Sequence, residues 1–472
     1  MVLKLAGAAF SAFFPTQYAV HIVLAIVTVL VLRAFSQGRR TNRERDLHAR
    51  KILITGGFTP FGLTILQSLA QRGAHIIALS PHPIDSPEVT IIISLLRTTF
   101  SNENIFAEQC DLASPSSIRS FCTRFLTGSD QRIDAIIFAH EYQHIGSAGV
   151  VSRTQSSKDS ALKREADSLA TFLITTLLLP ALLVAPVERD IRVITVVNPF
   201  YAAAAGPLFT IPFPSLSSPP STSIFLQEGL RSLRTSIFTR HLQRILDALP
   251  TAQVPKTDEG STIPIVSPKT QKSNIVSVCV SPGISRADTI APLLNADWTS
   301  PLGFSRTGVV LYILLQPLLR VLTKSPTASI QTVLHALFLP TPFKVLANSA
   351  PKEASDKSKG TKGTPIESFS TEIPEEVLKP GALYAECAIV KLKVPTPADP
   401  LTAEQNIGKE KEKSKTGLEE VLDIPDDGDF GGEVMGRLVW EAYEDALKAW
   451  ELANPSKEDV KEVAPDVDRD PK

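Results

Sequence analysis

The sequence predicts a doubly wound α/β fold with a parallel sheet, preceded by a membrane-spanning helix. From Lys51 onward, short β-branched runs alternate with longer helical stretches, which is typical of βαβ units. Residues 55–62 read TGGFTPFG and join the first such run to a helix. Before them, no charged residue occurs from Ala6 to Leu32. These three observations set the fold class and place the folded domain after an apolar N-terminal segment.

The elements of the domain follow from apolar pattern and from start and stop signals. Gly73 is a natural C-cap for the first helix, and Ser114 or Ser116 can begin the second. Strands are predicted at 51–55, 75–79, 104–112, 133–140, 192–198 and 274–283. Helices are predicted at 63–73, 114–126, 158–184, 225–249, 307–322 and 325–339, the helix at 225–249 being strongly amphipathic. Residues 206–222 and 250–273 are expected to be a loop and a polar insertion.

The N-terminal segment 1–35 is predicted to be an uncleaved membrane anchor. Its densest part, residues 19–32, reads AVHIVLAIVTVLVL, and a helix there can cross a hydrocarbon core of ~30 Å. The segment ends in arginines instead of a small-residue cleavage site, which disfavours a secretory signal, although Pro15 and His21 leave room for a helix that dips in without crossing. Because the basic linker 36–50 follows, the rest of the chain is expected in the cytosol. The endoplasmic reticulum is the preferred membrane, and the mitochondrial outer membrane the second choice.

The rest of the chain divides by composition. A nucleotide-binding-type domain is expected over 51–350, followed by a low-complexity linker over 351–430 with a strand-like island at 383–394. A helix is expected at 431–454, and a disordered tail at 455–472. Trp440, Tyr443, Leu447 and Trp450 form one stripe on that helix, which favours docking onto the main core over binding a protein partner.

Charge and cysteine content exclude several classes of function. A formal net charge of −1 gives no global attraction to nucleic acid. The four cysteines are widely separated and form no CxxC pair, which argues against a zinc site or a disulfide framework. His140 and His144 lie four residues apart without a second pair of ligands nearby, so no metal is expected.

The turn at 55–62 has the chemistry of a phosphate-binding loop. Gly56, just past the strand, permits a sharp turn, and Gly62 lets a helix N-terminus approach a pyrophosphate. Pro60 stands where such turns usually have a further glycine, and it removes one N–H group.

Over about residues 48–345 the order of these pieces resembles the short-chain dehydrogenase/reductase superfamily. The arrangement of anchor, basic linker and domain is similar to membrane-bound steroid and retinoid dehydrogenases. It also resembles a divergent, membrane-anchored fungal group of uncharacterised function with a long Lys/Glu-rich C-terminal extension. The resemblance implies a Rossmann-type domain that binds NAD or NADP, with these cofactor-binding residues: Thr55, Gly56, Gly57, Gly62, Ser80, Asp111, Leu112, Pro282 and Gly283.

The resemblance leaves two points about the cofactor open. Ser80-Pro81-His82 contains neither the acid nor the base that would select NAD or NADP, so the preference is undecided. Asp111 ends a strand, where it can be a plain turn or capping residue as readily as an adenine contact.

The catalytic residues of that superfamily are missing from this chain. None of the six tyrosines has a lysine four positions later. Asn198 stands where the catalytic serine is expected, and the tyrosine and lysine positions fall near Glu228 and Ser232. The helix asparagine that supports the proton relay falls near Asp167. The catalytic residues are therefore unknown, with Asn198 and Tyr201 as weak candidates.

Three functions remain open on these grounds. The first is a catalytically degenerate member that binds NAD(P) or a lipid-like ligand and acts as a sensor or assembly partner. The second is an active oxidoreductase on a lipid, steroid or retinoid-like substrate that uses substitute residues. The third is a structural scaffold. The missing Tyr-Lys pair favours the first over the second, and the retained glycine turn disfavours the third.

Overall fold

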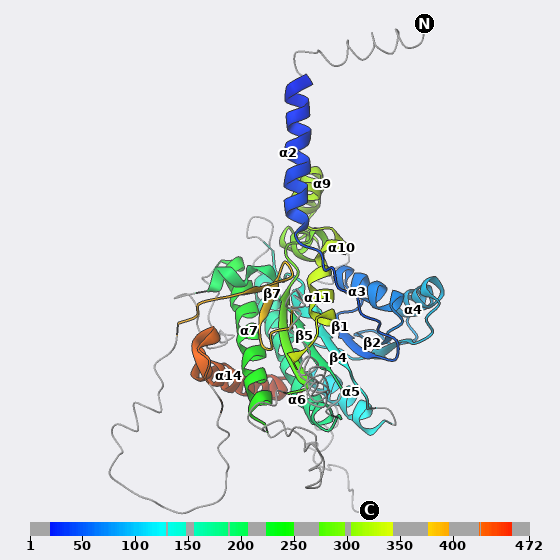
Figure 1. Cartoon of the computed structure of the whole chain (residues 1–472), viewed down its shortest axis with the longest axis vertical. Coiled ribbons are helices and arrows are strands. Elements are labelled where there is room, and N and C mark those ends of the chain that lie inside the picture. The colour runs from blue at the N-terminus through cyan, green and yellow to red at the C-terminus, as the bar shows by residue number, and fades with distance from the viewer. Residues whose placement is uncertain are drawn as a thin grey trace, which may run out of the picture.

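The computed structural model describes residues 19–128, 131–147, 155–186, 189–205, 223–249, 273–297, 304–342, 376–395, 424 and 426–455. An eight-stranded sheet lies at the centre, with the strand order β3-β2-β1-β4-β5-β6-β7-β8 (Figure 1). The first seven strands in that order are parallel, and β8 pairs antiparallel with β7. Their bounds are β1 Lys51–Thr55, β2 His75–Ser80, β3 Ile105–Gln109, β4 Ala135–Phe138, β5 Ile191–Val196, β6 Ile275–Ser281, β7 Leu383–Ala385 and β8 Ala388–Val390. The doubly wound sheet predicted from the sequence is confirmed.

Helices cover both faces of the sheet. On one face lie α3 (Pro60–Gln71), α4 (Pro87–Phe100) and α11 (Gln331–Phe338). On the other lie α5 (Pro115–Thr127), α6 (Gln155–Leu183), α7 (Ile224–Ala248) and α14 (Gly432–Ala453). Two cores result, and β1, β4, β5 and β6 are buried along their whole length between them. Such strands read as continuous apolar runs because both of their faces are covered.

The strand order reverses between β1 and β4, and this reversal positions the candidate site. In open parallel sheets, ligands bind beyond the carboxyl ends of the strands at such a switch point. Short helices follow two of these strand ends: η2 (His140–Tyr142) after β4 and η3 (Pro199–Ala204) after β5. After β6 come η4 (Arg286–Ile290), which has π-helical pairing, and α8 (Ala291–Leu293).

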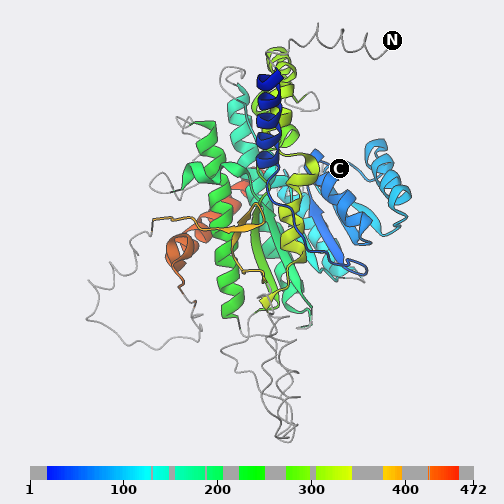
Figure 2. The same ribbon diagram turned by 45° about the horizontal axis from the view of Figure 1, so that its top comes forward.

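Two apolar helices stand away from the domain, side by side. They are α2 (Ala19–Gln37) and α9 (Arg306–Leu322), and both views show them together (Figures 1 and 2). Among the residues that the structure describes, two helices could cross a membrane by length and composition alone: α2 and α6. More than half of the apolar window of α6 is buried, which fits a core helix, whereas none of the α2 window is buried.

The structure differs from the sequence prediction at 383–394, where one strand was expected. Residues 383–390 form a hairpin of β7 and β8 instead. Its turn consists of Glu386 and Cys387, both with positive φ, as a tight two-residue turn requires. These residues rarely adopt that conformation, so the local sequence carries no hairpin signal. Contacts to the N-terminal linker hold the turn, because the Glu386 carboxylate accepts from the Arg39 amide and the Cys387 thiol donates to the Arg39 carbonyl.

Three helices also differ from expectation. No element was predicted at α4, although Val89, Ile93 and Leu96 are buried at helical spacing. The helix expected at 325–339 is divided into α10 (Pro326–Ser329) and α11, with Ile330 between them still in the right-handed helical region. The helix predicted as amphipathic at 225–249 is instead buried on nearly all sides.

The burial of α7 follows from the docking of α14. Preceded by η5 (Asp429–Gly431), α14 packs against α5, α6 and α7. Tyr443 stacks on Phe172 with ring centroids 5.3 Å apart, and Trp440 lies within 5.6 Å of Phe238. The stripe of α14 therefore covers a face of α7 that includes Phe238, Thr235 and His241, as the preferred interpretation of that stripe expected.

Candidate functional site

The glycine turn forms as predicted between β1 and α3. Gly56 has a φ of +66°, and a Cβ placed there would come 2.7 Å from the His140 amide nitrogen. A Cβ at Gly62 would lie 2.0 Å from the Gly56 carbonyl oxygen. The chain has room for neither, so both glycines are required by the close approach of the turn to β4 and to the helix start.

The first turn of α3 has its amide groups satisfied by the chain itself. Pro60 has no N–H, Phe61 donates to the Asp288 carboxylate (3.2 Å), and Gly62 donates to the Thr59 hydroxyl (3.0 Å). The amide of Leu63 bonds to the Thr59 carbonyl (2.8 Å). These are the orphan donors that would otherwise bind a pyrophosphate.

Asp288 therefore places a carboxylate where the resemblance places an anion of the cofactor. It lies on η4, 4% exposed, and its other oxygen accepts from the Ser285 hydroxyl (3.3 Å). Burial raises the pKa of Asp288 to about 6, against the opposing hydrogen bond from the Phe61 amide. Near pH 7 the side chain is therefore mostly anionic, and it can neutralise the positive end of the α3 dipole.

A buried tyrosine connects the glycine turn to the turn after β6. Tyr142 is fully buried, with its ring 4.4 Å from that of Phe61, and its hydroxyl donates to the Gly283 carbonyl (2.7 Å). Pro282-Gly283 is the turn that the resemblance assigns to the nicotinamide end of the cofactor, and Gly283 has a φ of +92°. Tyr142 thus packs between the turn expected to hold the pyrophosphate of a dinucleotide and the turn expected to hold its nicotinamide end.

The remaining predicted cofactor residues lie at the same edge of the sheet, mostly in structural roles. The buried Ser80 hydroxyl accepts from the His82 amide (3.1 Å), and Ser80 pairs with Gln109 across β2 and β3. The Asp111 carboxylate accepts from the Ala113 amide (3.0 Å), which is the turn-forming role that the sequence left open. Leu112 packs partly buried against the core, and Gly57 is buried in the turn.

Sequence reasoning gave His140 no role at the turn. Its Nδ1 lies 2.6 Å from the Thr55 hydroxyl, and its Nε2 lies 3.0 Å from the Asp167 carbonyl. The ring therefore connects the end of β1 to α6, with both nitrogens engaged. The sequence feature that could have indicated this role is the position of His140 directly after a buried strand.

The two candidate catalytic residues lie on or before η3. Asn198 is fully buried: its side-chain oxygen accepts from the Phe200 amide (3.1 Å), and its nitrogen lies 3.4 Å from the Tyr142 carbonyl. Tyr201 is partly buried against the core. Burial, followed by the charge of Glu386, raises the pKa of Tyr201, whereas an acid that exchanges protons near neutral pH needs a lowered one.

A buried ionic cluster occupies the region assigned to the superfamily's tyrosine and lysine. We call Arg164, Asp167, Glu228 and Arg231 the buried ionic cluster. The Glu228 carboxylate lies 2.7 Å from the Arg164 guanidinium and 2.9 Å from that of Arg231, and Arg231 lies 3.8 Å from Asp167. Arg231 also donates to the carbonyls of Glu141 and Gln143 (2.8 Å each). Sequence reasoning located Asp167 and Glu228 but missed both arginines, because their partners lie far away in the sequence.

The cluster is shielded from solvent. The Glu228 and His144 side chains have no exposed area, and Arg231 has 1%. Burial, with the charges of Arg231 and Arg164, lowers the pKa of His144 to about 3, so its ring is neutral at physiological pH. Arg164 and Asp167 at the rim of the cluster are only 10% and 13% exposed, so its charges pair with one another across α6 and α7 largely away from solvent.

Comparison with known proteins relates the chain to a family of oxidoreductases. The family model described as a KR domain matches residues 51–157. An uncharacterised oxidoreductase of Saccharomyces cerevisiae is 28% identical over 66% of this chain and 72% of its own length. The uncharacterised oxidoreductase pbr1 of Schizosaccharomyces pombe is 23% identical over 67% of this chain and 77% of its own length. Human polyprenol dehydrogenase is 27% identical over 42% of this chain and 56% of its own length.

Together with the parallel sheet, these similarities support membership of the chain in the short-chain dehydrogenase/reductase superfamily. Membership implies a nicotinamide dinucleotide cofactor, with the choice between NAD and NADP undecided by residues 80–82. The glycine turn has the required backbone shape. The pyrophosphate donors, however, are already engaged by Asp288 and Thr59, so the cofactor does not fit this arrangement of the chain.

Proposed function

We propose that this chain is a membrane-anchored, catalytically degenerate member of the superfamily that acts by binding, as a sensor or an assembly partner. The buried ionic cluster carries the proposal. General acid–base catalysis needs a group within hydrogen-bond reach of the substrate, with a pKa near the working pH. Glu228 stands near the position expected for the acid, and Ser232 near that of its activating lysine, yet the Glu228 carboxylate is fully buried and paired with Arg164 and Arg231.

The anchoring part of the proposal rests on α2. Its apolar window, Val20–Gln37, has a mean hydropathy of 2.0 and no buried residue. The basic linker after it favours a cytosolic domain, and we propose the endoplasmic reticulum before the mitochondrial outer membrane.

An active oxidoreductase on a lipid-soluble substrate is the second candidate. The similarity to polyprenol dehydrogenase favours it. It would need a substitute acid, for which Tyr201 is the candidate on η3.

An assay of the purified full-length protein in neutral detergent separates the two candidates. NADH or NADPH is supplied with retinal and with a polyprenal, and cofactor oxidation is followed by absorbance, with an active retinal reductase as positive control. We expect a rate no higher than that of the Gly56→Asp variant, whose side chain would fill the turn. Turnover that exceeds this background and is lost in Tyr201→Phe would overturn the proposal and establish a rewired acid.

Dinucleotide binding is measured separately by calorimetry. We expect weak or no binding to the wild-type protein, and tighter binding to Asp288→Ala, which frees the Phe61 amide. Asp297→Ala is the matched control, since it removes a nearby carboxylate whose charge acts on Asp288 while leaving the Phe61–Asp288 hydrogen bond in place. Tight binding to the wild type would show that Asp288 moves aside for the cofactor.

A further inference from the structure

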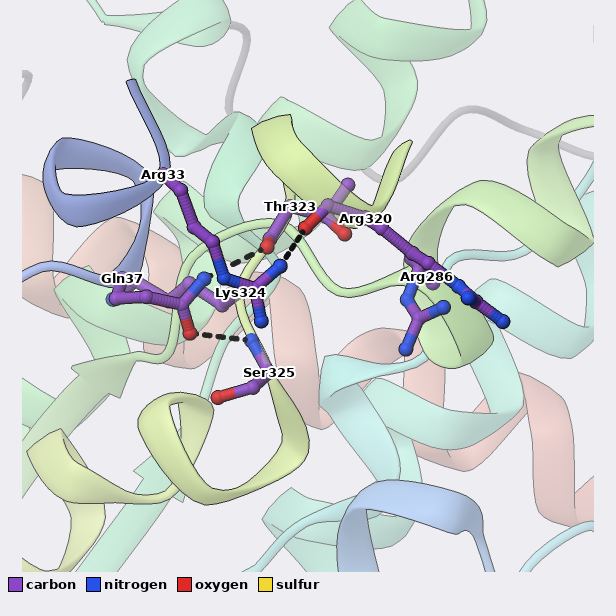
Figure 3. A pocket seen from close by; sticks show the side chains of 7 residues that line it. All are labelled: Arg33, Gln37, Arg286, Arg320, Thr323, Lys324 and Ser325. Atoms are coloured by element: carbon purple, nitrogen blue, oxygen red, sulfur yellow. Dashed lines mark hydrogen bonds between the residues drawn. The ribbon is translucent and has the colours of Figure 1, made fainter. Parts of the chain in front are cut away.

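The junction of α2 and α9 contains a basic pocket that neither the fold nor the cofactor site explains. Its cavity has a volume of about 240 Å³ (Figure 3). We call it the junction pocket, and its lining residues are Arg33, Gln37, Arg286, Arg320, Thr323 and Lys324, with Ser325 at its edge. Figure 3 shows Arg33 and Gln37 entering from α2, with Arg286 and Arg320 on the other side.

The two helices that line the pocket are held together because side chains in the last turn of α2 bond to the backbone at the end of α9. The Arg33 guanidinium donates to the Arg320 carbonyl (2.8 Å), and the Ser36 hydroxyl donates to the Val321 carbonyl (2.6 Å). The Gln37 amide donates to the Thr323 carbonyl (3.2 Å) and accepts from the Ser325 amide (3.0 Å). The C-terminal carbonyls of a helix have no partner within the helix, so these contacts join the two helices specifically.

The charge of the pocket is largely uncompensated. Lys324 pairs with Glu386 at 2.5 Å. Within the described residues, Arg33, Arg286 and Arg320 have no carboxylate partner within 4.0 Å; Arg286 bonds only to the neutral Gln316 side chain (3.2 Å). Three guanidinium groups around one cavity favour an anion, and arginine matches phosphate geometry especially well.

The position of the pocket selects a lipid over a soluble anion. Arg33 is the first charged residue after the apolar run of α2, so it marks the membrane–water boundary if α2 is inserted. Beside it, α9 exposes apolar side chains, among them Val310, Ile313 and Leu314, each more than 60% exposed. A basic site at the boundary, flanked by apolar helix surface, fits a molecule with an anionic head and acyl chains.

We propose that the junction pocket binds the headgroup phosphate of an anionic glycerophospholipid, with the acyl chains lying along the exposed apolar side of α9. This inference rests on the membrane anchoring proposed above, but not on the catalytic state of the domain. The lipid would fix the orientation of the domain at the membrane surface.

The test uses the purified full-length protein in neutral detergent and follows its melting temperature. A ligand that binds the folded state raises this temperature in a concentration-dependent way. We expect dioleoyl phosphatidic acid to raise it with saturation, and phosphatidylcholine with the same chains, or inorganic phosphate, to leave it unchanged. In the double variant Arg286→Gln/Arg320→Gln, the apparent affinity should fall about fivefold for each arginine and on the order of 25-fold for the pair.

A matched control removes the same charge outside the pocket. Arg39 and Arg40 are exposed in the adjoining linker, so Arg39→Gln/Arg40→Gln should keep the affinity within about twofold. An equal loss of affinity in both double variants would mean that the lipid is attracted by basic charge in general, and it would overturn the proposed lipid site. A rise in melting temperature with inorganic phosphate equal to that with phosphatidic acid would also overturn it.

Flotation on phosphatidylcholine vesicles separates failure of the pocket from failure of the anchor. The wild type and both double variants should float. Flotation without any response to phosphatidic acid would reject the junction pocket and leave the anchor standing. Failure of the wild type to float would reject the anchor, and the lipid site with it.

Discussion

At the scale of single residues, Asp288 makes the stability of the protein depend on pH. Its pKa, about 6, lies above its ordinary value of 3.8, so the folded state holds the proton more tightly than the unfolded chain. The corresponding stabilisation is complete below about pH 4 and is lost as the pH rises through 6. Over this window the free energy of unfolding of the wild type should fall by about 3 kcal/mol relative to Asp288→Asn. Urea unfolding at half-unit pH steps measures the difference, and parallel curves for the two proteins would refute the shift.

The second residue-scale prediction concerns Glu228. Its removal leaves Arg164 and Arg231 buried without their carboxylate, and breaking a buried pair on one side costs about 3–5 kcal/mol. We expect Glu228→Ala to lower the free energy of unfolding by that amount. Lys448→Ala is the control, because its pair with Asp445 is exposed and contributes at most about 1 kcal/mol. Similar losses in the two variants would show that the cluster is solvated.

At the scale of elements, the docking of α14 determines how much of α7 is buried. Tyr443 is 1% exposed and packs on Phe172 and Phe238. Truncation of a buried aromatic side chain costs about 3–5 kcal/mol, so Tyr443→Ala should destabilise the protein to that extent. Leu452→Ala, at a side chain 84% exposed on the same helix, should change stability by less than about 0.5 kcal/mol. Denaturant unfolding followed by tryptophan fluorescence makes the comparison, and a negligible loss in Tyr443→Ala would mean that α14 detaches in solution.

The linker between α2 and the domain is an element in its own right. Arg45 pairs with Asp190 at 2.9 Å, and Arg50 pairs with Asp134 at 3.2 Å. Asp190 also holds Arg192, which is 1% exposed and donates to the carbonyls of Ala336 and Leu339. Two of the basic residues that predict membrane orientation therefore also attach the linker after α2 to the core.

At the scale of the whole molecule, the prediction is one of orientation. If α2 spans the membrane with its arginines in the cytosol, protease added to intact microsomes should digest residues 48–472 and spare the N-terminal segment. Immunoblotting against a tag at each end of the protein follows the N-terminal segment and the domain separately. As a control, protease added to microsomes opened with detergent should also cleave the N-terminal tag. Protection of the C-terminal tag in intact microsomes would reverse the orientation, and cellular cleavage near residue 35 would contradict the anchor.

Much of the fold was predictable because its signals are local. The β-branched runs of β1, β2, β4, β5 and β6 are buried on both faces and stand out in the sequence without reference to any partner. The glycine turn is equally local, since Gly56 and Gly62 are required by steric contacts within one strand–turn–helix unit. The exposed apolar run of α2 needs no tertiary information either. The missing Tyr-Lys pair is also a property of the sequence alone.

What only the tertiary structure decided are contacts between residues distant along the chain. Asp288 lies 227 residues from the Phe61 amide that it accepts from, and no local pattern connects them. Arg231 gains its buried partners only when α6, α7 and the segment after β4 come together, and Arg320 meets Arg33 across 287 residues. Local propensity and periodicity report which face of an element is apolar. They do not report which charged group the fold brings to a helix end, and that pairing determines whether the N-terminus of α3 faces a cofactor phosphate or the Asp288 carboxylate.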